Sequence, residues 1–491
     1  MRVTLNDSDI QQPEIVKTTS RIDRIVKPKK QRTRPVRVPL TKKQKIVRTI
    51  FLIIGILAVC VLTYVGYSVY KAYKTGQAIG FSLRPKDIIA QNTPELRRDS
   101  TGKYTNALIV GIDTREKGDL LNTDTIILVS YSYDKNEIIM LSIPRDLHVQ
   151  IKPDVTWYSR INAVYATYEP KGDGLGIERL TDVVTEITGQ EIQYYGMVNY
   201  KGFVELIDSL GGIDINVENS FTDYKYPDGT GYKTVRFTKG PQVMDGKTAL
   251  EYSRSRHSNH NNEGTDFARA KRQQNVVAAI TEKVMSGSLL DPRALMNLFN
   301  VVQDNIQISE FTLDDIEAGV ILLSKFREDS DIYSFVLDPS AGASRLLTSQ
   351  NVINTGAYAI GPIDGLGNYT DIQEYLSQVW DDPQLYQENP IIKIYNTGLG
   401  YTETTKKYND MVKQFPYLKI GYMGTLSTDK TGTISYLNDD STYSHSLESI
   451  NKYIKPTSTI KPEYVTTRLN GEDITILYGE IIEEEITEIV E

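Results

Sequence analysis

The sequence is poor in the residue types that most often build transition-metal and nucleophilic sites. Of its 491 residues, one is a cysteine, Cys60, and four are histidines. A single cysteine excludes an intramolecular disulfide and a cysteine-ligated metal centre. The histidines, His148, His257, His260 and His445, leave little material for a histidine-rich zinc centre or a Ser-His-Asp triad. This elimination favours chemistry based on a magnesium-type cation, which prefers oxygen ligands.

Charge is absent from one long apolar run. Residues 49–70 contain no charged side chain, and about 20 apolar residues suffice for a helix to span a bilayer. Lys42, Lys43, Lys45 and Arg48 precede this run, so the positive-inside rule places the N-terminus in the cytoplasm. The run lies too far into the chain, and is too long, for a typical cleaved signal peptide. We expect a single-pass signal anchor in the cell membrane, with the C-terminal body outside the cytoplasm.

Large apolar residues are scarce before this run, and positive charge is abundant. Residues 1–48 hold 14 Lys and Arg against four acidic residues, although the whole chain has a formal net charge of -8. Such a composition predicts a disordered basic tail. A nucleic-acid-binding arm is the alternative, but no recognition fold accompanies it, so a cytoplasmic tail beside a membrane helix is favoured. Residues 71–102 are predicted to form a stalk.

Three β-branched runs, at residues 107–110, 125–130 and 138–143, predict neighbouring strands at the start of the body. If they run alternately up and down, Asp113, Asp124, Arg145 and Asp146 emerge at one edge of the sheet. Two carboxylates beside a guanidinium suit a divalent cation next to a bound phosphate. The alternative interpretation is that the acidic residues only form polar turns.

Helices and strands alternate beyond this point. Apolar residues at helical spacing predict helices at residues 176–189 and 200–210, and a strand follows at 213–217. Together with residues 291–380, this alternation predicts an α/β fold with a helix-covered sheet. The apolar helix faces are either core or the lining of a groove for a lipid chain.

A second charged segment follows. Arg254 and Arg256 are two residues apart, so an extended backbone would point both the same way. Asp266 is a candidate cap for a helix at about 267–284. One stripe of that helix carries Arg269, Arg272, Gln273 and Val276. Cations near a helix N-terminus oppose the helix dipole, and a bound anion would offset that cost. The arginines form either a diphosphate site or a solvated surface with structural salt bridges.

The C-terminal part predicts a smaller α/β unit. After a linker at 381–389, residues 390–480 alternate strand and helix patterns: strands at 391–395, 418–423, 433–437 and 473–478, and helices at about 402–412 and 447–453. Its residues include no convergent catalytic set, which favours a structural or wall-binding role. The final residues, 481–491, form an acidic tail that we expect to be frayed.

Five motifs in this order resemble the LytR-CpsA-Psr family of cell-envelope proteins. They are GIDTR (111–115), NTDTI (122–126), SIPRD (142–146), YSRSR (252–256) and TDFARAKRQQ (265–274). The resemblance spans about residues 103–290 and continues to about 380 as fold. It implies an α/β/α sandwich with a central mixed sheet, a catalytic domain over 103–380, and a C-terminal domain, at 390–480, of a type found in some family members.

The resemblance also implies roles for individual residues. It implies metal binding, of Mg2+ or Mn2+, by Asp113 and Asp124. It implies phosphate binding by Arg145, Arg254, Arg256, Arg269 and Arg272, with Gln273 nearby, and we add Arg115 and Asp266 to this diphosphate-binding set. The candidate catalytic residues are Asp113, Asp124, Arg145, Arg254 and Arg256. One departure is Asn122, where the family often has arginine. Either Arg115 contacts the same phosphate, or the site has one cation fewer.

The activity implied by the resemblance is transfer of a glycopolymer from a polyprenyl-diphosphate lipid to a peptidoglycan sugar hydroxyl, which forms a phosphodiester. Teichoic acid and capsule are the classes of polymer implied. The expected partners are the lipid-linked polymer, peptidoglycan and the membrane, with no nucleic acid. Two alternatives stay open: a noncatalytic regulator that binds lipid diphosphate or an anionic polymer, and a lipid pyrophosphatase in which water replaces the sugar hydroxyl.

Overall fold

The structure is a computed structural model. It describes residues 95–113, 121–172, 174–286, 305–310, 315, 318, 322, 331–337, 346–351, 358–426, 432–438, 441–463, 465 and 470–480. The predicted tail, membrane anchor and acidic C-terminus, most of the predicted stalk, and Arg115 lie outside these residues. Among the helices within them, none is both long enough and apolar enough to cross a membrane.

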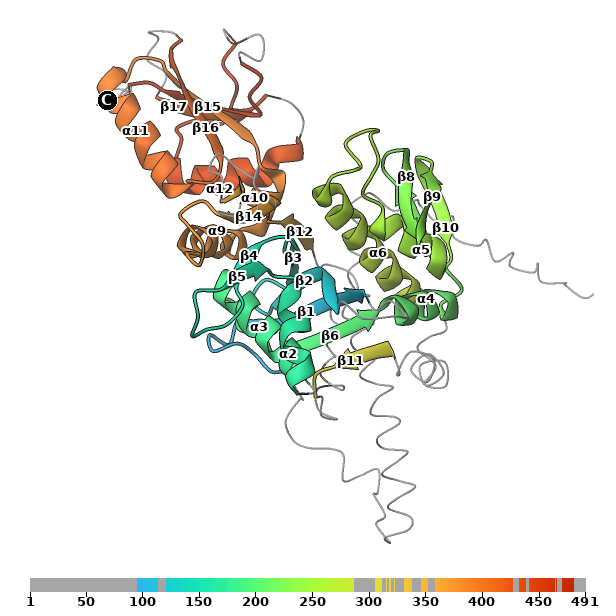
Figure 1. Ribbon diagram of the computed structural model, residues 1–491. Coiled ribbons are helices and arrows are strands. Elements are labelled where there is room, and N and C mark those ends of the chain that lie inside the picture. The colour runs from blue at the N-terminus through green and yellow to red at the C-terminus, as the bar shows by residue number, and fades with distance from the viewer. Residues whose placement is uncertain are drawn as a thin grey trace, which may run out of the picture. The chain divides into compact units, whose positions relative to one another are not determined.

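A six-stranded mixed sheet forms the centre of the protein, in the order β11-β6-β1-β2-β3-β12 (Figure 1). Its strands are β1 (Tyr104–Asp113), β2 (Asn122–Ser132), β3 (Glu137–Ser142), β6 (Tyr194–Asn199), β11 (Ile306–Ile308) and β12 (Ile332–Val336). β2 runs antiparallel to both β1 and β3, as predicted, whereas β6 is parallel to β1 and β12 is parallel to β3. The fold is therefore mixed α/β with a central mixed sheet.

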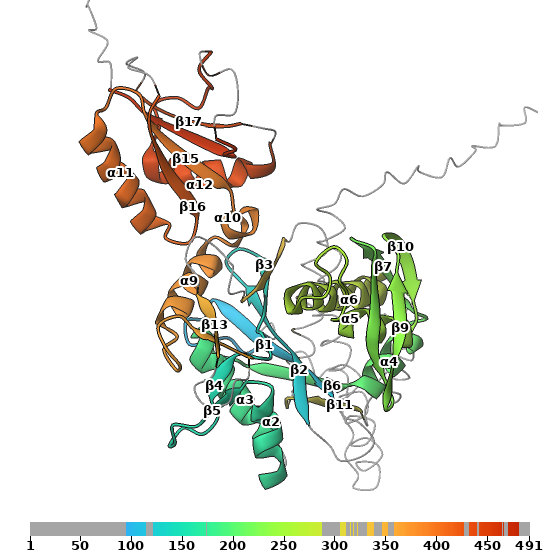
Figure 2. The same ribbon diagram turned by 45° about the horizontal axis from the view of Figure 1, so that its top comes forward.

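Side chains alternate between two buried faces of this sheet. Leu108 and Val110 pack in a core with helix α3 (Leu175–Thr188), whereas Ile109 packs on the opposite face in a cluster with Val277. Val277 belongs to helix α6 (Asp266–Ser286). Figure 2 shows α3 and α6 on opposite sides of the central strands. Because both faces are covered, the strands read as continuous apolar runs rather than as alternating ones.

A second core lies between α6 and a smaller group of elements. This group contains α4 (Tyr200–Ser209), β7 (Ile213–Val217), β8 (Phe221–Asp228), β9 (Gly231–Phe237), β10 (Gly240–Met244) and α5 (Gly246–Arg254). The chain leaves α4 through Gly211 and Gly212, both at positive φ, which glycine adopts without steric cost. The predicted helix at 200–210 and strand at 213–217 are both present.

The remaining elements flank the central sheet or follow it. They are β4 (His148–Gln150), β5 (Tyr158–Arg160), α2 (Ala163–Tyr168), η2 (Glu169–Lys171), β13 (Leu347–Asn351), β14 (Tyr358–Pro362), α9 (Thr370–Asp381) and α10 (Pro383–Glu388). α10 occupies the segment predicted as a linker, and its Leu385 and Tyr386 are buried. That segment is therefore an ordered helix with a buried side.

A four-stranded sheet follows α10, in the order β16-β15-β18-β17. It contains β15 (Ile391–Asn396), β16 (Lys419–Thr425), β17 (Thr433–Leu437) and β18 (Ile474–Tyr478), with α11 (Tyr401–Gln414), η5 (Ser441–Tyr443) and α12 (Ser444–Ile454) between the strands. All four strands and both α-helices coincide with predicted elements to within a few residues. Apolar residues such as Ile392, Ile394 and Ile476 are fully buried, which accounts for the clear sequence signal.

Candidate functional site

A β-bulge shapes the edge of the sheet where β1 ends and β2 begins. Gly111 pairs with Thr125 and Ile112 pairs with Thr123, so Asp124 is left over in β2. A bulge of this kind re-aims side chains, and such irregularities are common beside active sites. Asn122, Asp124 and Thr125 therefore all line one cavity, although a regular strand would point neighbouring residues to opposite faces.

This cavity, the first cavity below, has a volume of about 350 Å³ and brings together the ends of several strands. Asp113 ends β1, Asp124 lies at the start of β2, and Arg145 follows β3. The charged residues that line it in the described part of the chain are Asp113, Asp124, Arg145, Arg160, Arg254, Arg256 and Arg269, with Gln273 beside them. The predicted convergence at one sheet edge is thus present in the structure.

Arg145 joins the two acidic residues of the SIPRD and NTDTI motifs. Its Nη1 donates to Asp124 Oδ1 at 2.8 Å, and its Nε lies 3.6 Å from Asp146 Oδ2. Burial alone would lower the pKa of Arg145, but the carboxylates of Asp124 and Asp146 outweigh it and raise the pKa above its usual value. Arg145 therefore stays a cation inside the cavity.

Arg160 is a cation of this site that the sequence analysis did not single out. Its Nη1 lies 3.2 Å from Asp146 Oδ1, and its side chain is 41% exposed. Asp146 itself is buried, so one carboxylate holds both Arg145 and Arg160 from behind the cavity. The signal that could have found Arg160 is its place in a short strand, β5, that pairs with β4 directly after the SIPRD motif.

Tyr200 is a second residue that was not singled out. β6 runs parallel to β1, so its C-terminal end reaches the same sheet edge, and Tyr200 follows it. The Tyr200 hydroxyl donates to Asp124 Oδ2 at 3.3 Å, and the Arg254 guanidinium lies 4.0 Å from the Tyr200 ring centroid. Burial, together with the Asp124 carboxylate, raises the pKa of Tyr200 well above its usual value, so the hydroxyl stays protonated. Arg254 Nη2 lies 3.9 Å from Asp113 Oδ2.

The local structure around Arg254 and Arg256 differs from the predicted extended backbone. Arg254 is the last residue of α5, and the chain leaves the helix at Ser255. Both arginines still line the first cavity. One buried carboxylate holds this segment, because Asp223 Oδ2 accepts the backbone N–H groups of Arg256 and His257 at 3.0 and 3.2 Å. Asp223 is fully buried, so its carboxylate acts as an internal anchor for Arg256.

Helix α6 begins differently from the prediction as well. Thr265, not Asp266, accepts the capping hydrogen bond, from the backbone N–H of Ala268 at 3.1 Å. Asp266 is the first helical residue, and its Oδ1 lies 2.8 Å from Arg269 Nη1. Burial lowers the pKa of Arg269 below its usual value, and Asp266 counteracts that effect. The helix start therefore carries an ion pair, and the helix dipole stabilises its acidic member, Asp266.

A second cavity, of about 370 Å³, lies against the first. Asp266 lines the second cavity together with Thr265, Phe267 and Ala270. Residues common to the linings of both cavities are Asp124, Arg145, Arg256, Arg269 and Gln273. We call these five residues the shared wall.

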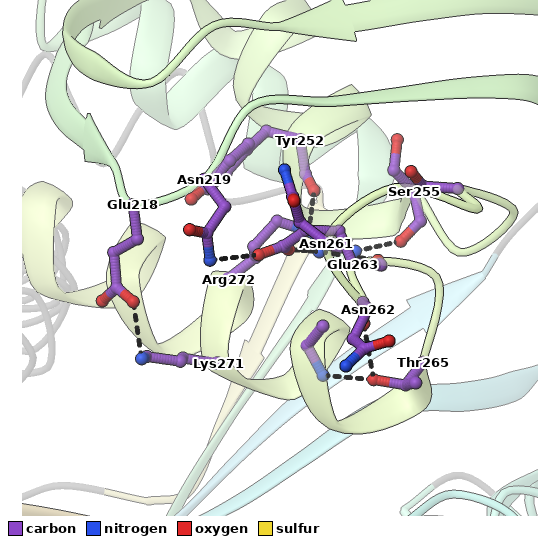
Figure 3. A network of polar contacts seen from close by, with 12 residues as sticks. Glu218, Asn219, Tyr252, Ser255, Asn261, Asn262, Glu263, Thr265, Lys271 and Arg272 are labelled. Carbon is purple, nitrogen blue, oxygen red and sulfur yellow. Dashed lines mark hydrogen bonds and ion pairs between the residues drawn. The ribbon is translucent and has the colours of Figure 1, made fainter.

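Arg272 does not line either cavity, which corrects its predicted place in the diphosphate site. Its side chain is 3% exposed and turns into the second core (Figure 3). Nε donates to the Tyr252 carbonyl at 3.0 Å, Nη2 to the Ser255 carbonyl, and Nη1 to Glu263. These carbonyls belong to the C-terminal end of α5, where a cation is favourable. Of the two predicted alternatives, a diphosphate site or structural salt bridges, Arg272 follows the second. Arg269 and Gln273 on the same helix face the cavity.

The oxygen donors of the first cavity fit a magnesium-type ion. Asp113 and Asp124 supply carboxylates, and neither histidine nor cysteine lines the cavity. Within the described part of the chain, there is no cluster of three or more His, Cys, Asp and Glu residues that could hold a metal ion. Mg2+ keeps several waters and is commonly held by one or two carboxylates plus substrate phosphates, so two carboxylates beside arginines fit such an ion.

Comparison with known proteins relates the chain to cell-wall proteins. It is 32% identical over 286 residues to "Polyisoprenyl-teichoic acid--peptidoglycan teichoic acid transferase TagV" of Bacillus subtilis. That match covers 56% of this chain and 68% of the relative. It is 28% identical over 275 residues to TagU of the same organism, a protein with the same activity in its name; that match covers 56% of this chain and 81% of the relative. The crystal structure of B. subtilis TagV matches at 23% identity with a TM-score of 0.42, over 57% of this chain and 98% of that one.

The family model named LytR_cpsA_psr matches residues 66–325, a span that contains every charged residue of the first cavity. This span is more than half of the chain. The chain belongs to the LytR_cpsA_psr family.

Proposed function

We propose that this protein is a membrane-anchored, magnesium-dependent phosphotransferase that moves a glycopolymer from a polyprenyl-diphosphate carrier to a sugar hydroxyl of peptidoglycan. The observation that carries the proposal is the first cavity, in which two carboxylates and five arginines face one space. A diphosphate is the ligand class that needs both, because its oxygens can be shared between guanidinium groups and a bound cation. The names of the relatives support the choice of donor and acceptor.

The cavity also has an apolar part that suits the lipid end of the donor. This part is lined by Val198 of β6, Phe203 of α4, Leu250 of α5 and Val276 of α6. An apolar wall next to arginines matches a molecule in which a hydrocarbon chain is joined directly to phosphate. We therefore propose that apolar residues at this cavity line a groove for a lipid chain, and that the chain is the polyprenyl group of the donor.

The chain's own residues would act by positioning and by charge. Arg145, Arg254 and Arg256 would hold the diphosphate oxygens through paired hydrogen bonds, and Arg269 would add charge from the start of α6. Asp113 and Asp124 would hold a magnesium ion, which supplies charge neutralisation when bound. Before the lipid donor binds, the 2.8 Å ion pair with Asp124 would keep the Arg145 guanidinium oriented. A phosphate of the bound donor would then compete with Asp124 for Arg145. Phosphoryl transfer needs little covalent help beyond this.

The predicted topology adds a further argument. We place residues 49–70 in the membrane and the body outside the cytoplasm, where nucleoside triphosphates are scarce. A transferase in that location needs a donor that carries its own high-energy diphosphate on a lipid. We also propose that residues 103–380 form the catalytic domain and that residues 390–480 form a separate module with a structural or wall-binding role. Protease digestion of intact cells should remove the body and spare the tail; a protected body would contradict this orientation.

The test is transfer by the full-length, detergent-solubilised protein from a polyprenyl-diphosphate-linked oligosaccharide to isolated glycan strands. We expect magnesium-dependent formation of a covalent product, lost in Asp113→Ala and Arg256→Ala although both variants remain folded. Donor binding without turnover would favour the noncatalytic alternative. Release of free lipid phosphate without a covalent product would favour the pyrophosphatase. Full transfer by both variants would refute the residue assignments.

A further inference from the structure

The two cavities meet at the shared wall, and this arrangement suggests where each of the two substrates binds. In phosphoryl transfer the attacking and leaving oxygens lie roughly in line, on opposite sides of the phosphorus atom. The shared wall contributes three guanidinium groups, from Arg145, Arg256 and Arg269, to both cavities. A phosphoryl group held by these residues would therefore border both cavities.

We propose that the second cavity binds the acceptor sugar, whose hydroxyl reaches the phosphorus atom from the side opposite the lipid. This inference rests on the proposed function and adds to it the location of the acceptor. We place the lipid in the first cavity, where Val198, Phe203 and Leu250 form an apolar wall beside the arginines. The second cavity also has apolar residues, such as Ile126, Val336 and Ile360, but it alone of the two carries Thr265 and Asp266 at the start of α6.

The lining of the second cavity suits a saccharide. Asp266 offers a carboxylate, Thr265 a hydroxyl, and Phe267 an aromatic ring; Asp266 and Phe267 are only partly buried. Carboxylates and hydroxyls bind sugar hydroxyl groups, and an aromatic ring packs on the apolar face of a sugar ring. The cavity's volume of about 370 Å³ leaves room for one or two sugar rings at the wall, on the order expected for a small-molecule site.

Asp266 is the carboxylate that we assign to the incoming hydroxyl. Both described carboxylates of the second cavity have partners: Asp266 contacts Arg269, whereas both oxygens of Asp124 are engaged, one by Arg145 and one by Tyr200. The sugar oxygen attacks the phosphorus atom that bears the glycopolymer, and its proton passes to Asp266. The bond from that phosphorus atom to the oxygen of the lipid phosphate breaks, and lipid monophosphate leaves with the electron pair. The product is a phosphodiester between the glycopolymer and the acceptor sugar.

The experiment compares one large substitution in each cavity of the full-length protein. Ala270→Trp adds volume to the second cavity from α6, and Leu250→Trp adds volume to the first from α5. KM is measured separately for a polyprenyl-diphosphate-linked oligosaccharide and for uncrosslinked glycan strands. We expect Ala270→Trp to raise the acceptor KM about tenfold or more and to leave the donor KM within about twofold. Leu250→Trp should show the reverse pattern.

Two further variants keep the inference testable if Ala270→Trp does not fold. Phe267→Ala should raise the acceptor KM alone, and Asp266→Asn should lower kcat by roughly 10²-fold or more with the donor KM retained. An unchanged acceptor KM in both Ala270→Trp and Phe267→Ala, or a raised donor KM in either, would overturn the assignment of the second cavity. A wild-type protein without any transfer would instead overturn the proposed function.

Discussion

The strand ends at residues 113, 124 and 145 and the helical segment at 254–273 both bring charged side chains to the first cavity, but they do so through different local structures. In an antiparallel arrangement, strand ends must meet at a sheet edge, so three separate motifs converge through backbone pairing alone. In the helical segment the destination of each arginine depends on what packs around it. Arg269 faces the cavity, whereas Arg272, three residues later, faces the second core.

The difference shows that a helical stripe is weaker evidence for a shared site than a set of strand ends. Residues three apart on a helix lie on similar faces, but α6 is buried on more than one side. Arg272 therefore contacts the carbonyl groups at the end of α5 and the Glu263 carboxylate. A cation is favourable at a helix C-terminus, just as it is beside a phosphate.

The largest effect is expected on stability, at Arg272. Arg272→Ala would leave the Glu263 carboxylate without its cation and the carbonyls of Tyr252 and Ser255 without a donor. Removing one member of a buried ion pair typically costs about 3–5 kcal/mol. Denaturant titration should show this loss, whereas Lys271→Ala, on the exposed side of the same helix, should change stability by less than about 0.5 kcal/mol. Similar losses in both variants would contradict a structural role for Arg272.

The next effect is on activity, at Asp124. Asp124→Ala removes a carboxylate from the first cavity and the ion-pair partner of Arg145. We expect kcat/KM for the lipid donor to fall by roughly 10²–10³-fold, the range for loss of one electrostatic contact in an active site. Asp134→Ala is the matched control, because Asp134 is exposed in the turn between β2 and β3, at the opposite end of these strands. A loss confined to the control variant would reverse the site assignment.

A smaller effect is expected at Asp223, which acts on the site only through the backbone. Asp223→Ala removes the acceptor for the N–H groups of Arg256 and His257. A displaced Arg256 should weaken binding of inorganic pyrophosphate about tenfold, measured by titration calorimetry. Asp223→Asn retains a side-chain oxygen and should recover part of the affinity, and Asp228→Ala on the same strand should have no effect. Equal affinity in Asp223→Ala and the wild type would show that Arg256 needs no such anchor.

The smallest effect is a pH dependence from His148, which lies behind the strand-end residues. Burial lowers the pKa of His148 below its usual value of 6.5. The folded state therefore takes up this proton at a lower pH than the unfolded chain, and stability falls as pH drops from about 6.5 toward the folded-state pKa. One such group contributes a slope of at most about 1.4 kcal/mol per pH unit. His148→Gln should make the denaturation midpoint less dependent on pH over this range. An unchanged pH dependence in this variant would exclude His148 as the cause of the slope.

Much of the fold could be predicted because its signals are local. The run at 391–395 and the helix pattern ending at Gly189 have the lengths and boundaries of the elements that form there, and Gly189 adopts the left-handed conformation of a helix end. The segment 381–389, predicted as a linker, contains the helix α10, which its polar composition did not suggest. Its polar residues include Asp382, which caps α10, so polarity there reflects a helix start and not an exposed loop.

The site was predictable in part, and its gaps have a common cause. Arg160 and Tyr200 lie outside the recognised motifs and reach the cavity through β4–β5 pairing and the parallel course of β6. The bulge at Asp124 has no local sequence signal, because it depends on which residue of β1 faces which residue of β2. Long-range pairing of this kind leaves no periodicity in the chain.

The near absence of cysteine and histidine indicates, without any structure, that oxygen donors and arginines dominate the candidate site, and the strand runs indicate where carboxylates leave the sheet. Which arginines reach the cavity depends on tertiary packing. A guanidinium group can be stabilised by phosphate, by a carboxylate such as Glu263 or by the carbonyls that end a helix. Which of these Arg269 and Arg272 meet depends on packing against elements more than ten residues away.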